Sequence, residues 1–328
     1  MKKGSVMNGP LAPVVLIIYR RPDLTKLVFE EVRKIKPKTL YIVADGPAAE
    51  KTGDESRVKA AREAVNSVDW DCQLTQIFAE ENMGLKNRII SGLDEVFSRE
   101  DFAIILEDDC LPSESFFRFA SELLQRYKSD ERVGLVSGSQ RLRGKKLSLA
   151  SYEFSKDVRI WGWATWARTW NKFSQSGDAH AQWTKKEARI DRNLFPTGPR
   201  RRSMGSMMRE AKSLDSWAVP FAVHCVKKGY LNVVPSENLI SNIGVGSDST
   251  HTAFENWVVE VPRGEISFPL VHKKQVVDEG YFDSAESRTD LRQLIGYPLR
   301  HPADAFSRIA RFVLNRLGFK RRRSGTLS

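Results

Sequence analysis

Three consecutive acidic residues, Glu107-Asp108-Asp109, directly follow the apolar run 102–106. The run has the length and composition of a buried strand. In an open α/β sheet, ligands bind beyond the carboxyl ends of the strands, which is where these acids would lie. Adjacent carboxylates repel one another, so the triplet favours a site where a hard divalent cation such as Mg²⁺ or Mn²⁺ supplies compensating charge. The alternative is an acidic turn that stabilises the positive end of the following helix.

The first half of the chain alternates strand and helix patterns. Short apolar runs predict strands at 14–19, 39–44, 73–79, 102–106 and 133–137, and helical spacing predicts helices over 24–35, 48–68, 84–97 and 113–127. This alternation predicts an α/β fold whose central sheet is mostly parallel and carries helices on both faces. Further along, we expect loops with short helices over 177–214, a helix at 218–228 and a strand at 230–235.

In order and spacing these motifs resemble the nucleotide-sugar glycosyltransferases of the GT-A fold, in particular bacterial family-2-like sugar transferases and the N-acetylglucosaminyltransferase I group. Residues 104–109, followed by Pro112 and Phe116-Phe117, look like their central strand, metal-binding Asp-x-Asp type motif and next helix. The run 14–18 leading into Tyr19-Arg20-Arg21-Pro22 looks like their first strand and nucleotide loop. The resemblance covers about residues 12–250 and implies a Rossmann-like GT-A domain.

The resemblance also implies roles for individual residues. Asp109 would contact a Mn²⁺ or Mg²⁺ ion, while Glu107 and Asp108 would contact the ribose or water. The residues implied to bind the nucleotide sugar on the neighbouring loops are Tyr19, Arg21, Asp45, Asn82, Gly84 and Lys86, with Arg88 as an alternative to Lys86. Among them, Asp45 stands where an acidic residue of the family contacts the base.

An inverting transfer needs a base that takes the proton of the acceptor hydroxyl. The family places an acid next to a Trp in a later loop, and Leu214-Asp215-Ser216-Trp217 matches that pattern, although Ser216 replaces one acid of the commoner tandem version. Asp215 is therefore the predicted base. The other interpretation is an Asp that caps the helix beginning near Trp217.

Four of the eight Trp residues fall within residues 161–170. Large aromatic side chains of a domain this size are usually core, so most of them are expected to pack. Gly162 between two Trp residues would let the backbone approach a sugar ring. The resemblance supports this second role, because an aromatic-Gly-Trp segment borders the donor and acceptor pocket in related transferases, which makes Gly162 and Trp163 candidate sugar-binding residues.

Two later features carry two interpretations each. His251 lies in a Gly/Ser/Asp/Thr loop, and related transferases use a late His against the metal or the diphosphate, which makes it a second candidate metal ligand; a lone loop His is otherwise simply exposed. The run Arg200-Arg201-Arg202 would suit a phosphorylated acceptor or form a solvated basic loop.

The formal net charge is +11, of which residues 300–328 contribute +7. The body of the chain is thus only mildly basic, and no nucleic-acid partner is expected. Apolar residues at helical spacing over 306–317, flanked by Arg and Lys, predict an amphipathic basic helix that either lies on an anionic membrane or packs on the domain. Three scattered Cys residues and the lack of a long apolar run predict a cytoplasmic protein, with the inner face of the membrane as a place of peripheral attachment.

Together these features predict a GT-A glycosyltransferase domain over residues 1–295, with a nucleotide-binding half at about 12–140 and an acceptor half at about 141–295, and a basic helix and tail at 296–328. The predicted reaction is metal-dependent, inverting transfer of a sugar from a nucleoside-diphosphate donor to a hydroxyl of a glycan or lipid-linked acceptor. The alternatives are a sugar-1-phosphate nucleotidyltransferase, whose Gly-rich first loop is absent here, and a non-catalytic basic protein that binds membranes or nucleic acid.

Overall fold

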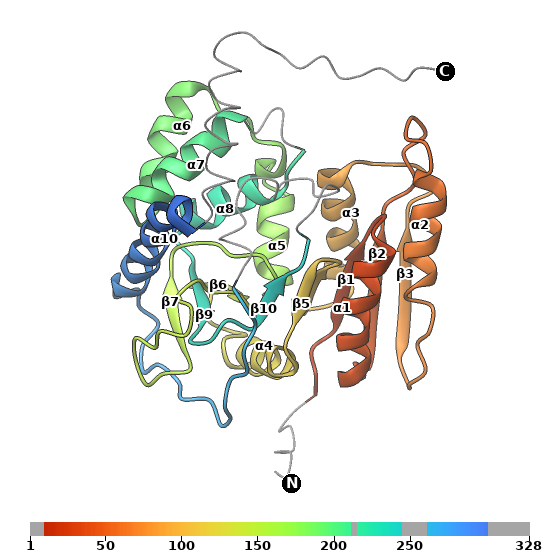
Figure 1. Ribbon diagram of the computed structural model, residues 1–328, viewed down its shortest axis with the longest axis horizontal. Coiled ribbons are helices and arrows are strands. Elements are labelled where there is room, and N and C mark those ends of the chain that lie inside the picture. Colours follow the sequence, from red (N-terminus) through yellow and green to blue (C-terminus); the bar gives the residue numbers. More distant parts are fainter. Residues whose placement is uncertain (1–9, 211–214, 245–260, 301–328) are drawn as a thin grey trace.

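A computed structural model describes residues 10–210, 215–244 and 261–300 (Figure 1). The strands of its main sheet are β1 (Val14–Ile18), β2 (Thr39–Ala44), β3 (Gln73–Phe78), β4 (Phe102–Glu107), β6 (Val133–Ser137), β7 (Tyr152–Ser155), β8 (Trp163–Trp166) and β9 (Leu231–Pro235). They lie in the order β3-β2-β1-β4-β8-β6-β9-β7. Only β7 and β8 run against the other strands of this sheet, which confirms the predicted α/β fold with a mainly parallel sheet.

Helices cover both faces of the sheet, as predicted. The α-helices are α1 (Pro22–Ile35), α2 (Asp54–Glu63), α3 (Leu85–Phe97), α4 (Glu114–Arg126), α5 (Ala167–Ser174), α6 (Lys185–Asp191), α7 (Gly198–Glu210), α8 (Ala218–Lys227) and α10 (Tyr281–Arg300). Successive side chains of a strand point to opposite faces. Leu16 of β1 therefore belongs to the core with Phe29 of α1 and Phe117 of α4, whereas Ile17 belongs to the core with Leu93 of α3 and Phe221 of α8.

The register of the parallel strands brings three loops to one edge of the sheet. Ile17 of β1 is level with Glu107 of β4, and Ile18 is level with Ala44 of β2. Parallel strands with this register end together, so the residues that follow each strand meet at the same edge. The acidic triplet, the loop after β1 and the loop after β2 are thereby neighbours.

A small antiparallel ribbon lies against this edge. It consists of β5 (Cys110–Pro112) and β10 (Ile240–Asn242), with Asn242 opposite Cys110. The ribbon returns the chain from residue 240 to the acidic triplet. Each strand has three residues, which is too short to show a period in the sequence, so this pairing was not predicted.

The Trp-rich segment forms β8 near the middle of the sheet, between β4 and β6. Its residues Trp163 and Trp166 are buried, as is Trp170 in α5, which confirms the predicted packing role. The strand itself was not predicted, because a segment buried on both faces shows no alternation of polar and apolar residues.

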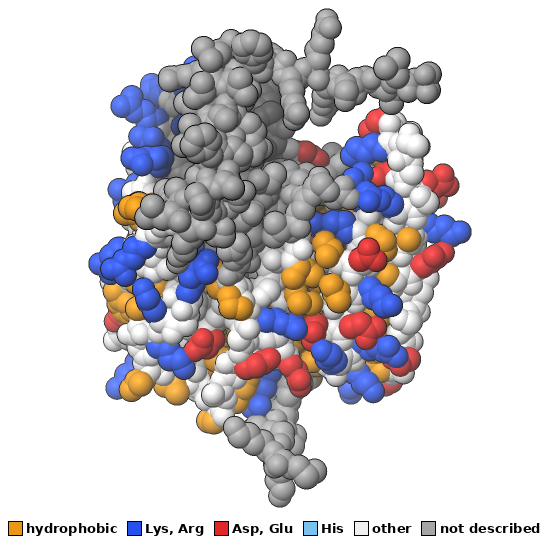
Figure 2. Space-filling model, in the orientation of Figure 1, with side chains coloured by type: hydrophobic (Ala, Val, Ile, Leu, Met, Phe, Trp, Pro, Cys, Tyr) orange, Lys and Arg blue, Asp and Glu red, His pale blue; other side chains and the backbone are white. Residues whose placement is uncertain are grey.

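The second half supplies α6 and α7 within the region predicted to hold short helices, and α8 and β9 where a helix and a strand were predicted. Helix α10 was not predicted, and it runs through residue 295, the predicted boundary of the domain. The predicted helix at 306–317 lies outside the described residues. Among the helices of the described part, none is long and apolar enough to cross a bilayer. On the face in Figure 2, Lys and Arg gather along the edge that carries α6, α7 and α10, and both signs of charge mix over α1 and α2.

Candidate active site

The acidic triplet is bound by an arginine from the loop after β1. Arg21 donates from Nε to Asp108 Oδ2 at 3.3 Å and from Nη2 to Asp108 Oδ1, and its Nη1 lies 3.0 Å from Asp109 Oδ2. Asp108 is buried, and both Glu107 and Asp109 are half-buried. One guanidinium group therefore pairs with two of the three carboxylates, and the site retains an excess of negative charge.

Burial and the close spacing of these carboxylates change the pKa values of the triplet. Burial raises the pKa of Asp108 to about 6, although the Arg21 guanidinium acts in the opposite direction. Burial, together with the charges of Asp109 and Asp108, raises the pKa of Glu107 to about 8. Both shifts mean that the site disfavours its own full ionisation, which is the condition that an additional cation relieves.

The backbone after β10 packs directly onto Asp109. The Ile243 N–H donates to the Asp109 carbonyl oxygen at 2.8 Å, and the Gly244 N–H donates to Asn242 Oδ1 at 2.9 Å. A Cβ atom at position 244 would lie 2.8 Å from the Cβ of Asp109 and would also meet its carboxylate. Only glycine fits here, so Gly244 sets the position of the Asp109 side chain. The sequence offered no signal for this contact.

Tyr19 is held by a buried acid that sequence reasoning missed. The Tyr19 hydroxyl donates to Asp54 Oδ2 at 2.6 Å, and Arg20 Nη1 donates to Asp54 Oδ1 at 2.9 Å. The Ala48 N–H also donates to Asp54 Oδ2. Asp54 begins α2 and is 1% exposed. It thus ties the loop after β1 to the loop after β2.

Asp45 and Asn82 join the same network. Asn82 Nδ2 donates to the Tyr19 hydroxyl at 2.9 Å and to Asp45 Oδ2 at 3.1 Å. The backbone N–H groups of Gly46 and Met83 both donate to Asp45 Oδ1 at 2.9 Å. Burial raises the pKa of Asp45, against the effect of these backbone donors. Asn82 therefore links Tyr19 to Asp45, so three predicted nucleotide residues from three separate loops belong to one network.

Asp215 lies beside the start of α3. Gly84 precedes α3 with φ of +80°, and a Cβ atom added there would lie 2.8 Å from Asp215 Oδ2. Helix α8 begins at Ala218 with Trp217 at its N-cap and no side-chain cap hydrogen bond. The interpretation of Asp215 as the cap of this helix is therefore wrong. Lys86 is half-buried in the first turn of α3.

Trp163 belongs to the core rather than to an open surface. It is 0% exposed and stacks on Trp217, with ring centroids 5.6 Å apart and an interplanar angle of 24°. The prediction that Trp163 contacts the sugar is therefore wrong, because a side chain with no exposed surface cannot touch a ligand. Trp163 instead packs against Trp217, two positions after Asp215. Gly162 has φ of +58°, and a Cβ atom there would clash with Ile240 of β10. Both residues are therefore buried behind the site and pack against the segments that carry it.

A divalent metal ion at the triplet would have few ligands from the protein itself. The described residues contain no group of three or more His, Cys, Asp or Glu side chains arranged around a common point. Mg²⁺ commonly uses one or two carboxylates and completes its shell with water and substrate phosphates. Asp109 and its neighbours supply carboxylate oxygens and uncompensated charge, so they fit that mode. His251 lies outside the described residues.

Comparisons with known proteins found likenesses among solved structures alone. No protein-family model and no curated protein matches the chain. Among solved structures, the chain is similar to a mannosyltransferase, PcManGT from Pyrobaculum calidifontis in complex with GDP-Man and Mn²⁺, at 14% identity and a TM-score of 0.37, over 67% of this chain and 75% of that one. It is also similar to a UDP-glucose pyrophosphorylase complexed with UDP-glucose, at 14% identity and a TM-score of 0.27, over 49% of this chain and 71% of that one.

Proposed function

We propose that this protein is a glycosyltransferase that moves a sugar from a nucleoside-diphosphate sugar to a hydroxyl of a glycan or lipid-linked acceptor, with inversion at the anomeric carbon. The observation that carries the proposal is the meeting of the loops after β1, β2 and β4 at one sheet edge, with Asp215 against the loop that precedes α3. Ligands of open α/β sheets bind at such an edge.

The network of Tyr19, Asp45 and Asn82 supports a nucleoside subsite. Its members are fixed by hydrogen bonds from three loops, so the surface that they form is preorganised before a ligand binds. Preorganised polar groups avoid the entropic cost of ordering on binding. Arg21, which now lies between two carboxylates of the triplet, is the cation best placed to meet a diphosphate at this edge.

Asp109 would hold the Mn²⁺ or Mg²⁺ ion, with Asp108 and Glu107 beside it and His251 as a further candidate ligand. When bound, the ion supplies Lewis-acid stabilisation of the leaving diphosphate. Gly244 would keep the Asp109 carboxylate in one position, because any side chain there would displace it.

Asp215 would act as the general base. Its carboxylate takes the proton of the acceptor hydroxyl while the hydroxyl oxygen forms a bond to the anomeric carbon, and the bond from that carbon to the phosphate oxygen breaks. The electron pair of the broken bond leaves with the nucleotide, so charge is balanced. The stacked pair of Trp163 and Trp217 would fix the backbone that carries this base.

The proposal is tested by incubating the full-length protein with UDP-, GDP-, dTDP- and CMP-sugars, with and without Mn²⁺, and measuring released nucleotide. We expect metal-stimulated release from one of the three nucleoside-diphosphate donor classes, and none from CMP-sugars, which carry a single phosphate. A parallel reaction with added pyrophosphate tests the nucleotidyltransferase alternative, which would form a nucleoside triphosphate and a sugar 1-phosphate. Formation of the triphosphate, or no release from any donor, would contradict the proposal.

A further inference from the structure

A hollow lies among the elements of the second half of the chain, and no residue of the acidic triplet lines it. It is a cavity of about 420 Å³, within the size range of pockets that hold small ligands. Its walls come from the segment between β7 and β8 and from helices α7, α8 and α10. Most of the wall is apolar, and the apolar side chains include Ile160, Trp161, Met204, Met207, Val219 and Leu291.

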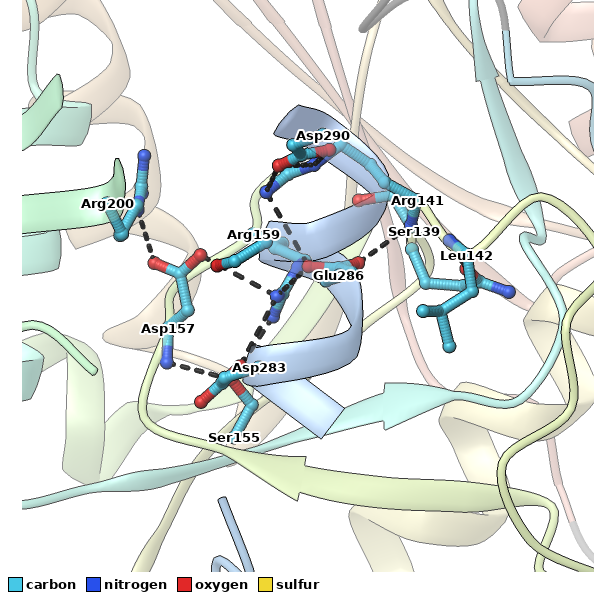
Figure 3. A network of polar contacts seen from close by, with 12 residues as sticks. Ser139, Arg141, Leu142, Ser155, Asp157, Arg159, Arg200, Asp283, Glu286 and Asp290 are labelled. Carbon is cyan, nitrogen blue, oxygen red and sulfur yellow. Dashed lines mark hydrogen bonds and ion pairs between the residues drawn. The ribbon is translucent and has the colours of Figure 1, made fainter. Parts of the chain in front are cut away.

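The floor of this cavity is a network of charged side chains (Figure 3). Arg159 lies at its centre, in contact with Glu286 and 3.6 Å from a carboxylate oxygen of both Asp157 and Asp283. Arg141 Nη2 lies 3.2 Å from Asp290 Oδ2 and 3.5 Å from Glu286 Oε2, and Arg200 Nε lies 2.6 Å from Asp157 Oδ1. Three of the carboxylates, at positions 283, 286 and 290, share one face of α10, because their spacing follows the helical period.

The balance of positive and negative charge in this network decides which ligands the cavity accepts. Each arginine is already paired with at least one carboxylate, and the four carboxylates outnumber the three guanidinium groups. An acidic ligand would therefore add a fifth negative charge. Asp283 and Arg159 are almost fully buried, whereas the side chains of Arg141 and Asp290 are 23% and 20% exposed and line the cavity. A guanidinium group donates hydrogen bonds and a carboxylate accepts them, and a hydroxyl group does both.

A second, smaller hollow lies next to the cavity, on the side of the edge that carries the acidic triplet. This hollow of about 20 Å³ shares Arg141, Arg159 and Trp161 with the cavity and extends to Asn242. The Asn242 side chain accepts from the Gly244 N–H, and Gly244 packs on Asp109. On the other side, Ala218 and Val219 of the cavity wall follow Asp215 closely in the chain.

We propose that this cavity binds a neutral saccharide unit of the acceptor, with hydroxyl groups on Asp290 and Arg141 and an apolar ring face on the Trp161 wall, and that it rejects acidic or phosphorylated saccharides. That this unit belongs to the acceptor rests on the proposed function; the binding chemistry of the cavity does not. The arginines of the floor hold the carboxylates in place and leave no net positive charge for an anion.

The test applies the full-length protein to an array of immobilised neutral, uronic-acid and phosphorylated di- and trisaccharides, and measures nucleoside-diphosphate binding separately by calorimetry. We expect binding to neutral saccharides alone. Asp290→Asn, which keeps the shape of the side chain, should weaken that binding at least tenfold and leave nucleotide affinity unchanged.

A second variant fills the cavity without touching the ion network. Met207→Trp, at a wall residue that is 39% exposed, should also weaken saccharide binding at least tenfold. Its matched control is Leu74→Trp, at a residue of β3 that is 36% exposed and outside the cavity. Binding of acidic saccharides alone, no saccharide binding at all, or neutral binding that survives both variants would overturn the inference. If the wild-type protein binds neutral saccharides but no nucleoside diphosphate, that result would contradict the proposed function and leave this inference standing.

Discussion

The carboxylate of Asp215 packs against Gly84, a residue that lies far from it in the sequence, so closely that a Cβ atom at position 84 would come within 2.8 Å of Asp215 Oδ2. This contact joins the loop that carries Asn82 to the turn before α8. It brings the predicted base to the predicted nucleotide loop, which neither segment could indicate alone.

Asp215→Asn should lower transfer to acceptor by a factor of about 10² to 10⁴, the usual contribution of a general base. Donor affinity should stay unchanged, because the amide keeps the shape of the carboxylate and the base acts on the acceptor. Steady-state transfer and nucleotide calorimetry measure the two effects. Asp191→Asn, at an acid between Trp183 and Lys227, is the control and should retain activity. Near-normal transfer by Asp215→Asn would show that another group is the base.

Gly244→Ala tests the close packing at the acidic triplet. The new methyl group must displace the Asp109 side chain, and overpacking of this kind costs about 1 to 3 kcal/mol. We expect affinity for Mn²⁺ with a nucleoside diphosphate to fall by about tenfold or more. Gly198→Ala is the matched control, because a Cβ atom at position 198 meets nothing within 4 Å. Equal affinities of the two variants would contradict the role given to Gly244.

Much of the fold follows from local patterns in the sequence. Some elements can be recognised from their own residues alone. These are the apolar runs of β1, β2 and β4 and the periodic apolar faces of α1, α3 and α4, each of which is long enough to show its pattern. Strand β8 and the ribbon of β5 and β10 depend on long-range pairing, which leaves no period in three or four residues.

The residues of the candidate site also divide into those that local sequence patterns predict and those that depend on partners distant in the chain. The acidic triplet could be predicted because it directly follows the apolar run of β4, and Asp45 could be predicted because it directly follows β2. Asp54, Gly244 and the ion network of α10 owe their roles to partners that are distant in the chain, so residue type and spacing carried no signal. Trp163 was misassigned because its residue type suits both sugar stacking and core packing, and only its burial separates the two.

The stability of the fold is expected to depend on pH through His224. The Nδ1 atom of His224 lies 2.6 Å from Asp178 Oδ2, while burial lowers the pKa of His224 below the ordinary value. Below about pH 6.5 the unfolded chain takes up a proton that the native state resists, so the free energy of unfolding should fall as the pH decreases from 7 to 5. The loss is about 1.4 kcal/mol for each unit by which the pKa is lowered.

Urea denaturation at pH 5, 6 and 7 measures this effect, and His224→Leu removes the titrating group. The variant should show a shallower dependence of unfolding free energy on pH than the wild type over this range. An unchanged slope in His224→Leu would mean that other groups cause the dependence.

The basic segment at residues 300–328 is expected to bind anionic membranes. Each Lys or Arg near such a surface contributes about 1 kcal/mol, which would recruit the protein to a lipid-linked acceptor at the inner face of the membrane. Co-sedimentation with anionic and neutral vesicles measures this. We expect binding to anionic vesicles only, lost at high salt and on truncation at residue 299. Full-length protein that stays in the supernatant at low salt would contradict the membrane role.

The most direct test of the account is nucleotide release from the preferred nucleotide sugar as a function of Mn²⁺ concentration, compared between the wild type and Asp109→Asn. The substitution removes one carboxylate charge from the triplet at nearly constant shape, so the fold should persist, as circular dichroism would verify. We predict that metal-stimulated release falls at least a hundredfold in Asp109→Asn. Metal-stimulated release at the wild-type level in this variant would contradict the central claim that the triplet after β4 holds the ion and the donor diphosphate.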